Sequence, residues 1–402
     1  KVLRIHYQDQ NETKIFGITT TALKISHLNI LVSHTACVLL LFFVLKFSTG
    51  YRWQSAFVAA LFAIHPVSNG PVSILCQRTY PFSTFFFLMA LGVYCYYMKA
   101  PSIKKYLLLF CLWILSISSH PSTLHLPLIL LLYDFWPLDK IELGSTGIST
   151  VKKSIIVKLP LFLFLFIMSV ATLLTLIYKT TLLNGLTELG DPSFYKKLLI
   201  VPIYYVKYLQ KIIWPSPLRL NSVTSDAIPL VEFGVSCFII IAVTGAVLWQ
   251  APRRRYLITG WFWYIITLAP AIASLIITST PIPKRYAYFP AIGIFIMFAW
   301  GGHEILSRLK YKKLSAGVIS ATIIVTLMIT SYHQTQCWKD IHHFFKYTAD
   351  KLSPHHPTTH RNYAVLLLYE NRIPEAIERL EHTLTLDPKY AEAHYWLGVA
   401  RD

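Results

Sequence analysis

The sequence predicts an all-α protein that consists of a polytopic membrane helix bundle followed by a short helical solenoid. Of its 402 residues, 54% are hydrophobic and only 14% are charged, which is too apolar for a soluble globule of this length. After Tyr332, long apolar runs give way to amphipathic segments. The net charge is +18, but the basic residues lie in short loops between apolar runs, which argues for a membrane topology and against nucleic-acid binding.

Ten apolar runs predict membrane helices, and the shorter ones are expected to extend into their flanks. The ten runs are Asn29–Leu45, Trp53–Ile64, Phe82–Met98, Tyr106–Ile117, Leu124–Trp136, Pro160–Tyr178, Pro229–Trp249, Tyr256–Ile276, Ala287–His303 and Leu314–Tyr332. A transmembrane domain of about ten spans is therefore expected over residues 1–332.

The distribution of Lys and Arg predicts which side of the membrane each loop faces. Five loops are basic: Lys46/Arg52, Lys99/Lys104/Lys105, Lys140/Lys152/Lys153/Lys158, Arg253–Arg255 and Arg308/Lys310/Lys312/Lys313. All five face the cytoplasm together only if residues 180–227 stay on the far side, so Phe194–Trp214 is expected to be a re-entrant or interfacial helix. If that helix spans instead, the orientation of half the protein inverts. The first orientation places Lys1–Ser26 outside the cytoplasm and implies a further membrane helix upstream of this sequence.

The tail, residues 333–402, has the 34-residue period of tetratricopeptide repeats. A shift by this period aligns three pairs of positions: His360 with His394, Tyr363 with Leu397, and Ala364 with Gly398. About one and a half repeats are visible, and a solenoid this short must continue, dock on the membrane domain or bind a partner. The residues that we expect to bind a partner protein are Tyr363, Leu367, Tyr395 and Trp396.

Three polar motifs interrupt the apolar runs on the predicted far side. They are His65-Pro66 with Gln77-Arg78, the segment SSHPSTLHLPLILLLYDFWPL at Ser118–Leu138, and KRYAYFP at Lys284–Pro290. An isolated arginine at such a place is either part of a functional site or a snorkelling anchor. Together with HLNILVSH at His27–His34 and the repeats, these motifs make the chain resemble the transmembrane-and-tetratricopeptide-repeat family.

The resemblance covers nearly the whole chain and implies a fold and activity of GT-C type. Eukaryotic members of the family are protein O-mannosyltransferases of the endoplasmic reticulum, and bacteria have relatives. Proteins of the GT-C superfamily transfer sugars from polyprenyl-phosphate donors on the extracytoplasmic side. The resemblance therefore implies a glycosyltransferase that moves a sugar, with mannose as the candidate, to a protein hydroxyl. The repeats would recruit the acceptor in the lumen or the bacterial periplasm.

A polyprenyl-phosphate donor needs a fixed cation that binds its phosphate and stabilises the leaving group. The candidates for this role are Arg78, Arg285, Lys284 and His120, with His65, Tyr286 and Tyr288 as supporting residues. The acceptor hydroxyl needs a carboxylate that removes its proton. Family members supply an acidic pair that would lie upstream of Lys1 here, and the carboxylates left in that loop are Asp9 and Glu12.

The sequence also departs from the family pattern. Gly70 and Tyr80 stand at positions that are often acidic in relatives, and His120 stands where a lysine commonly precedes proline. These departures support a second hypothesis, a catalytically silent membrane scaffold that binds partner proteins through its repeats. A transporter is disfavoured because no span carries a carboxylate at mid-membrane depth.

Beyond the lipid-linked donor, the sequence predicts no specific cofactor. The histidines and cysteines lack the spacing of metal ligands, so no metal-binding residues are expected, although the family resemblance leaves a divalent metal open. Asp134, near the cytoplasmic end of its helix, is expected to be a structural partner of a basic loop.

Overall fold

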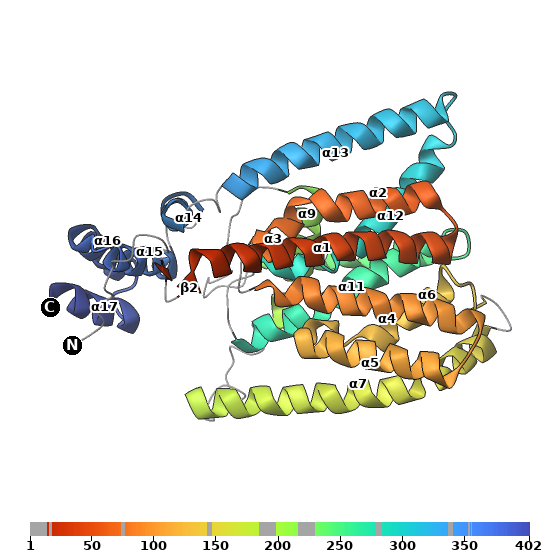
Figure 1. Ribbon diagram of the computed structural model, residues 1–402, viewed down its shortest axis with the longest axis horizontal. Coiled ribbons are helices and arrows are strands. Elements are labelled where there is room, and N and C mark those ends of the chain that lie inside the picture. Colours follow the sequence, from red (N-terminus) through yellow and green to blue (C-terminus); the bar gives the residue numbers. More distant parts are fainter. Residues whose placement is uncertain are drawn as a thin grey trace.

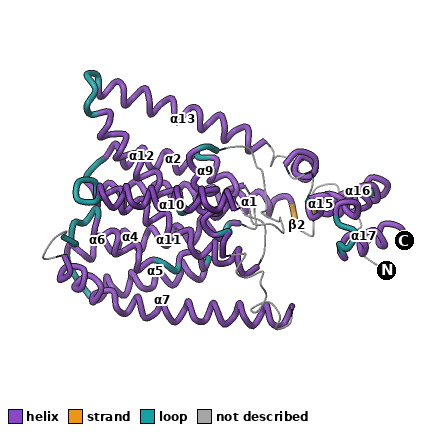
Figure 2. The backbone as a smooth tube through the Cα atoms, turned by 180° about the vertical axis from the view of Figure 1, so that it is seen from behind, coloured by secondary structure: helices purple, strands orange, loops and turns teal. Residues whose placement is uncertain are grey.

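The computed structural model describes residues 14–15, 18–73, 77–142, 147–184, 198–215, 230–278, 284–336, 341–352, 354 and 356–402. Its long helices run side by side, and a group of short helices lies beyond one end of this bundle (Figure 1; seen from behind in Figure 2). Two-residue strands β1 (Lys14–Ile15) and β2 (Ile18–Thr19) pair in antiparallel register just before the first helix.

All ten apolar runs lie largely within helices. The helices of the membrane part are α1 (Thr20–Thr49), α2 (Arg52–Ile64), α3 (Pro66–Ser73), α4 (Thr79–Lys99), α5 (Ile103–Ser119), η2 (Pro121–Thr123), α6 (Leu126–Phe135), α7 (Gly147–Asn184), α9 (Val201–Ile213), α10 (Leu230–Gln250), α11 (Arg255–Thr278), η3 (Lys284–Ala287), α12 (Ala291–Leu306) and α13 (Lys312–Gln336). The predicted all-α membrane fold is therefore confirmed.

Not every one of these helices is long enough to cross a bilayer. Among the described residues, six helices have the length and apolarity of a span: α1, α4, α7, α10, α11 and α13. Helices α2 and α3 form a seventh candidate if they count as one span, bent by 56° at His65. With 17, 10 and 16 residues, α5, α6 and α12 are shorter than the ~20 residues that a span needs.

Proline explains where several helices end. The proline ring disfavours the helical region for the residue that precedes it. His65, Ala100, His120 and Trp136 each precede a proline, and each follows directly on the last residue of a helix with an extended backbone. At the break between α2 and α3, the Ser68 hydroxyl donates to the carbonyl of Phe62 (2.9 Å), which satisfies an acceptor that the interrupted helix leaves open.

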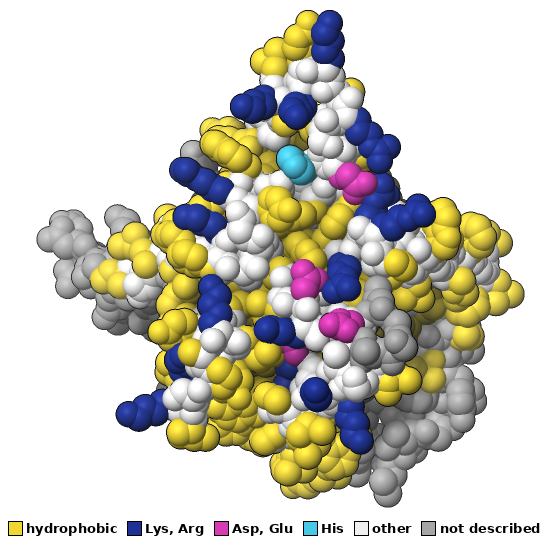
Figure 3. Space-filling model, turned by 90° about the vertical axis from the view of Figure 1, so that its right-hand side faces the viewer, with side chains coloured by type: hydrophobic (Ala, Val, Ile, Leu, Met, Phe, Trp, Pro, Cys, Tyr) yellow, Lys and Arg dark blue, Asp and Glu magenta, His cyan; other side chains and the backbone are white. Residues whose placement is uncertain are grey.

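The bundle has two chemically different ends. Lys and Arg side chains cover the end that carries the α1–α2, α4–α5, α6–α7, α10–α11 and α12–α13 connections, which we call the basic end (Figure 3). The tail lies beyond the opposite end, which we call the repeat end (Figure 1). The five basic loops therefore share one end, as expected, although Lys152, Lys153 and Lys158 lie inside α7 rather than in a loop.

Within the region expected to stay on the far side, the described residues 198–215 contain α9. This helix has 13 residues, too few for a span. Its Tyr205 hydroxyl donates to the carbonyl of Ile265 in α11 (3.0 Å), and the Tyr264 hydroxyl donates back to the carbonyl of Tyr205. These bonds hold α9 against the bundle, in agreement with a helix that does not cross.

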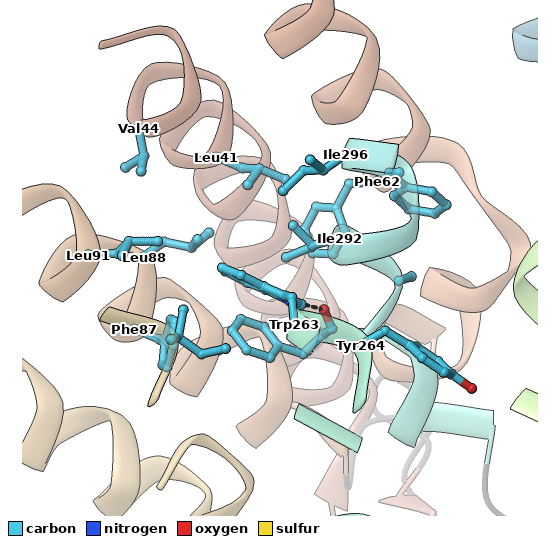
Figure 4. Close-up of a cluster of buried hydrophobic side chains, with 14 of the residues drawn as sticks. Leu41, Val44, Phe62, Phe87, Leu88, Leu91, Trp263, Tyr264, Ile292 and Ile296 are labelled. Carbon is cyan, nitrogen blue, oxygen red and sulfur yellow. Dashed lines mark hydrogen bonds between the residues drawn. The ribbon is translucent and has the colours of Figure 1, made fainter. Parts of the chain in front are cut away.

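Helices α11 and α12 pack closely because two glycines face each other. A Cβ atom at Gly293 would lie 2.3 Å from the carbonyl oxygen of Gly260, so only glycine fits there. The indole of Trp263, at the centre of the core, donates to the carbonyl of Phe289 (3.2 Å) and packs near Phe87 (Figure 4). The core thus joins α4, α11 and the start of α12.

A buried ion pair fastens α6 to α7. Asp134 accepts hydrogen bonds from the Lys158 ammonium, the Ser154 hydroxyl and the Tyr94 hydroxyl, and all four side chains are buried. A buried carboxylate with three donors is fully paired, so the group has a structural role. The prediction that Asp134 is a structural partner of a basic residue agrees with this arrangement.

The tail consists of α14 (Ile341–Tyr347), a π-helical turn η4 (Thr348–Leu352), α15 (Pro357–Tyr369), α16 (Ile373–Leu386) and α17 (Ala391–Arg401). The ring of His360 donates to the carbonyl of Pro354 (2.9 Å), and the ring of His394 makes the same bond to Pro388 (2.9 Å). The two bonds are 34 residues apart, which is the period read from the sequence.

Candidate functional site

Several of the predicted site residues meet at the repeat end of the bundle. The start of α4, the turn η2, the turn η3 and helix α9 contribute Tyr80, His120, Tyr286 and Tyr208, which we call the tyrosine cluster. The rings of Tyr80 and His120 are 4.1 Å apart between centroids, and those of Tyr80 and Tyr286 are 6.2 Å apart. Burial, followed by the neighbouring phenols that include Tyr286 and Tyr80, raises the pKa of Tyr208 well above 10.

Local hydrogen bonds orient His120 within this cluster. Its Nδ1 accepts from the backbone N–H of Ser122 (3.1 Å), so the side chain caps the short helix η2. The extended backbone before Pro121 turns the imidazole away from α5 and toward Tyr80. Tyr80 and His120, two positions at which a departure from the family pattern was expected, therefore contact each other here.

Cations flank the tyrosine cluster. Arg78, at the N-cap position of α4 two residues before Tyr80, is exposed. Lys284 and Arg285 open η3 and directly precede Tyr286, and their side chains lie outside the described part of the structure. The backbone therefore brings the predicted phosphate-binding positions Arg78, Lys284 and Arg285 to the repeat end, close in sequence to the clustered rings.

A further cation, Lys211 of α9, was not singled out from the sequence. Its ammonium lies 5.7 Å from the ring centroid of Tyr208, and the side chain is half-buried. Desolvation, followed by the like charge of Lys207, lowers the pKa of Lys211 to about 8. Lys207 is paired with Glu232 (3.3 Å), whereas among the described residues no carboxylate pairs with Lys211. Lysines are common at a membrane interface, and the position of Lys211 in the sequence did not indicate that its side chain is partly buried.

Among the residues that the structure describes, carboxylates are scarce at the repeat end of the membrane domain. Asp9 and Glu12, the predicted bases, lie outside the described residues. Within the described part of the membrane domain, the carboxylate at this end is Glu232, at the start of α10. The other described acids of that domain, Asp134, Asp139, Glu142 and Glu304, belong to the basic half.

Two of the expected supporting residues are buried in the core. His65 accepts from the backbone N–H of Val67 at Nδ1 (3.1 Å) and donates from Nε2 to the carbonyl of Ile212 (3.0 Å), so both ring nitrogens are occupied. Tyr288 is fully buried and bonds Nδ1 of His34 (2.8 Å). Both side chains support the site through packing and lack the exposure that contact with a sugar requires.

Among the described residues, no group of three or more His, Cys, Asp or Glu side chains is arranged to hold a metal ion. The described residues therefore offer no metal centre at either end of the bundle.

The predicted partner-binding residues of the tail occupy different environments. Tyr363 and Leu367 are buried by the chain itself, against Ala349 and Ala376, so the prediction that they form a partner surface is wrong. The Tyr363 hydroxyl is hydrogen-bonded to Nε2 of His342 (3.1 Å). Tyr395 is 65% exposed, which agrees with the predicted contact role. Trp396 packs on the inner cluster of α15–α17.

Comparison with known proteins finds two kinds of relative. A family model described as a TPR repeat, that is a tetratricopeptide repeat, matches residues 366–401. The protein named protein O-mannosyl-transferase TMTC1 of Mus musculus is 25% identical over 150 residues, and its counterpart of Homo sapiens is 24% identical over 148 residues. Each match covers 37% of this chain and only 16% or 17% of the relative. No solved structure matches the chain significantly.

These matches confirm the resemblance to a family of transmembrane proteins with tetratricopeptide repeats. With its apolar helices of spanning length, the chain is an integral membrane protein that carries a TPR repeat at its C-terminal side.

Proposed function

We propose that this protein is a membrane glycosyltransferase that moves a sugar from a polyprenyl-phosphate donor to a protein hydroxyl at the repeat end of the bundle. Mannose is the proposed sugar because the matched relatives are named mannosyltransferases. The observation that carries the proposal is the tyrosine cluster, because it gathers His120 and Tyr286 from two of the sequence motifs, together with Tyr80 just after the Gln77-Arg78 motif, at one end of the bundle.

The proposed reaction requires cations that stabilise the leaving phosphate. Cleavage of a sugar–phosphate bond leaves negative charge on the phosphate, and a fixed cation lowers the barrier by stabilising that charge. Arg78 and Arg285 are proposed to bind the phosphate, with Lys284, His120 and Lys211 beside them. Lys211 suits the role because its charge is partly desolvated, and an anion would compensate for that cost.

The aromatic rings of the tyrosine cluster offer a surface on which the sugar ring can stack. Phenol and imidazole rings stack against the apolar face of a pyranose and offer hydroxyl and N–H groups to its hydroxyls. The half-buried rings of His120 and Tyr286 are proposed as this surface, and the buried ring of Tyr80 supports them from behind. The general base is proposed to be a carboxylate near the chain start, with Asp9 and Glu12 as candidates.

The proposed orientation places the basic end in the cytoplasm and the repeat end in the lumen or the periplasm. The tail would then share a compartment with the tyrosine cluster and present an acceptor protein to it. The exposed Tyr395 on α17 is a proposed contact for that protein.

Single replacements test the phosphate assignment. Arg78→Ala and Arg285→Ala are each expected to lower sugar transfer from a polyprenyl-phosphate donor in membranes roughly ten- to a hundredfold, as for loss of a charged hydrogen bond. Lys104→Ala, an exposed cation at the basic end, is the matched control and should leave turnover unchanged. Unchanged turnover in both arginine variants would refute the assignment.

A second candidate function is a scaffold without transferase activity. It is favoured by the contact between Tyr80 and His120, two positions where the chain departs from the family pattern, and by the scarcity of described carboxylates at the repeat end. A scaffold predicts no transfer by the wild-type chain in membranes, together with retention of a partner that Tyr395→Ala weakens. Measurable transfer that depends on Arg78 or Arg285 would exclude it.

A further inference from the structure

Helix α13 is loosely attached to the rest of the bundle. None of its residues is buried. It is tied to α3 near the repeat end, where Asn69 and Ser331 exchange two hydrogen bonds of 3.2 and 2.8 Å. From there α13 diverges from α2 toward the basic end (Figure 1; the same splay is seen in Figure 2).

The divergence leaves a groove of about 430 Å³ between α13 and the helices α2 and α12. Its walls include Trp53 and Phe57 of α2, Phe298 of α12, and Ile319 and Ile323 of α13. Fourteen of the 18 lining residues are apolar or glycine, and the polar ones are Gln54, His65, His303 and Ser320. The ring nitrogens of His65, at the inner end, are already hydrogen-bonded. No Lys, Arg, Asp or Glu side chain lines the groove, so its walls favour an apolar occupant.

The length of the groove matches one leaflet of a bilayer. Its lining runs along α2 from Trp53 to His65, which spans about 18 Å at ~1.5 Å per residue. One leaflet contributes roughly half of the ~30 Å hydrocarbon core. Because α13 and α2 are farthest apart at the basic end (Figure 1), we infer that an occupant enters from the leaflet at that end.

Cations stand at the open mouth of the groove. The connection from α12 to α13 carries Arg308, Lys310, Lys312 and Lys313, all exposed. Arg308 lies 3.6 Å from Glu304, while no described carboxylate pairs with the three lysines. Lys312 lies one helical turn before Ala316, a residue of the groove wall, so charge and groove share a face of α13.

We propose that this groove binds an acyl chain of an anionic phospholipid, whose headgroup contacts the lysines of the α12–α13 connection. The apolar walls select a hydrocarbon chain, and the unpaired cations select a negative headgroup in the same leaflet. The lysines that would bind the headgroup lie at the end opposite to the tyrosine cluster, while the inner end of the groove reaches His65 and Ile212. The proposal does not depend on the proposed function.

Native mass spectrometry of the full chain, exchanged into nanodiscs of phosphatidylglycerol or phosphatidylcholine, tests the proposal. The wild-type chain is expected to retain phosphatidylglycerol in preference. Replacing Lys310, Lys312 and Lys313 together by Gln should weaken that retention roughly a hundredfold, from the attraction of three basic residues to an anionic surface. The matched control is replacement of Lys104, Lys152 and Lys153 by Gln, which removes equal charge from the same end but from α5 and α7.

A second variant acts through the groove and not through charge. Ala316→Phe should fill the groove and lower retention of phosphatidylglycerol while leaving every lysine in place. Equal retention of both lipids by the wild-type chain would overturn the proposal, as would equal losses in the two triple variants. Retention of a polyprenyl phosphate that phosphatidylglycerol does not displace would also overturn it, because the occupant would then be an isoprenoid.

Discussion

The pH dependence of donor binding should report on Lys211. Desolvation and the like charge of Lys207 lower the pKa of Lys211 to about 8, from 10.5 in water. A lowered pKa means that the ammonium is present below pH 8 and is lost as the pH rises through 8. If Lys211 binds the donor phosphate, affinity for the donor should fall between pH 7 and pH 9, where an ordinary lysine stays charged.

The magnitude follows from the fraction of Lys211 that is protonated. With a pKa of about 8 this fraction falls roughly tenfold between pH 7 and pH 9, so binding that requires the ammonium should weaken about tenfold. A bound phosphate should raise the pKa again, because an opposite charge favours the ammonium. Binding at pH 8 should therefore take up about half a proton.

Isothermal titration of the detergent-solubilised chain with a polyprenyl phosphate, in two buffers of different ionisation enthalpy, measures both quantities. Lys211→Arg is the matched control, since a guanidinium keeps its charge throughout this range and should remove the pH dependence. Equal affinity of the wild-type chain at pH 7 and pH 9, with no proton uptake, would refute the role of Lys211 as a phosphate contact.

Three further predictions concern stability. Gly293→Ala should destabilise the bundle by about 1–3 kcal/mol through overpacking, measured by thermal unfolding in detergent, whereas Gly317→Ala, in open space, should not. Asp134→Asn should lower the free energy of unfolding by about 3–5 kcal/mol in the same assay, because it leaves the buried Lys158 ammonium without its counter-charge. Adding Lys158→Met should recover part of that loss. Burial lowers the pKa of His360 and outweighs the bond to Pro354, which raises it. The folded tail therefore favours the neutral ring, and α15 is fully stable above pH 6.5. As the pH falls through 6.5, α15 should lose hydrogen-exchange protection. Protection unchanged between pH 7.5 and 5.5 would contradict that assignment.

The strongest sequence signals were those that repeat. Long apolar runs predicted the ten helices because hydrophobic burial in a bilayer depends on composition more than on exact contacts. The 34-residue period aligned His360 with His394, and in the structure the two rings make the same hydrogen bond. The number of full spans was harder to predict from the sequence, because α5, α6 and α12 are short helices held by packing. A hydropathy pattern does not show how far a packed helix continues.

Burial was the property that sequence patterns judged least well. Tyr363 and Leu367 fit the repeat pattern of a binding face, yet their own neighbours cover them. Tyr288 and His65 follow or flank polar motifs, yet they lie in the core because the bend at Pro66 and the close contact of α11 with α12 draw the chain inward. Lys211 shows the same error: its sequence position suggests an exposed interface lysine, but its side chain is half-buried.

The two ends of the bundle use positive charge in different ways. At the basic end the lysines are numerous and exposed, so water and salt screen them and each contributes little beyond topology and attraction to an anionic leaflet. At the repeat end Lys211 sits partly desolvated beside Tyr208, and the field of such a charge is screened far less. A phosphate that approaches Lys211 therefore gains more per charge than one at the basic end. The five basic loops hold 16 of the 37 lysines and arginines behind the net charge of +18, while recognition of a lipid-linked donor would depend on partly buried cations such as Lys211.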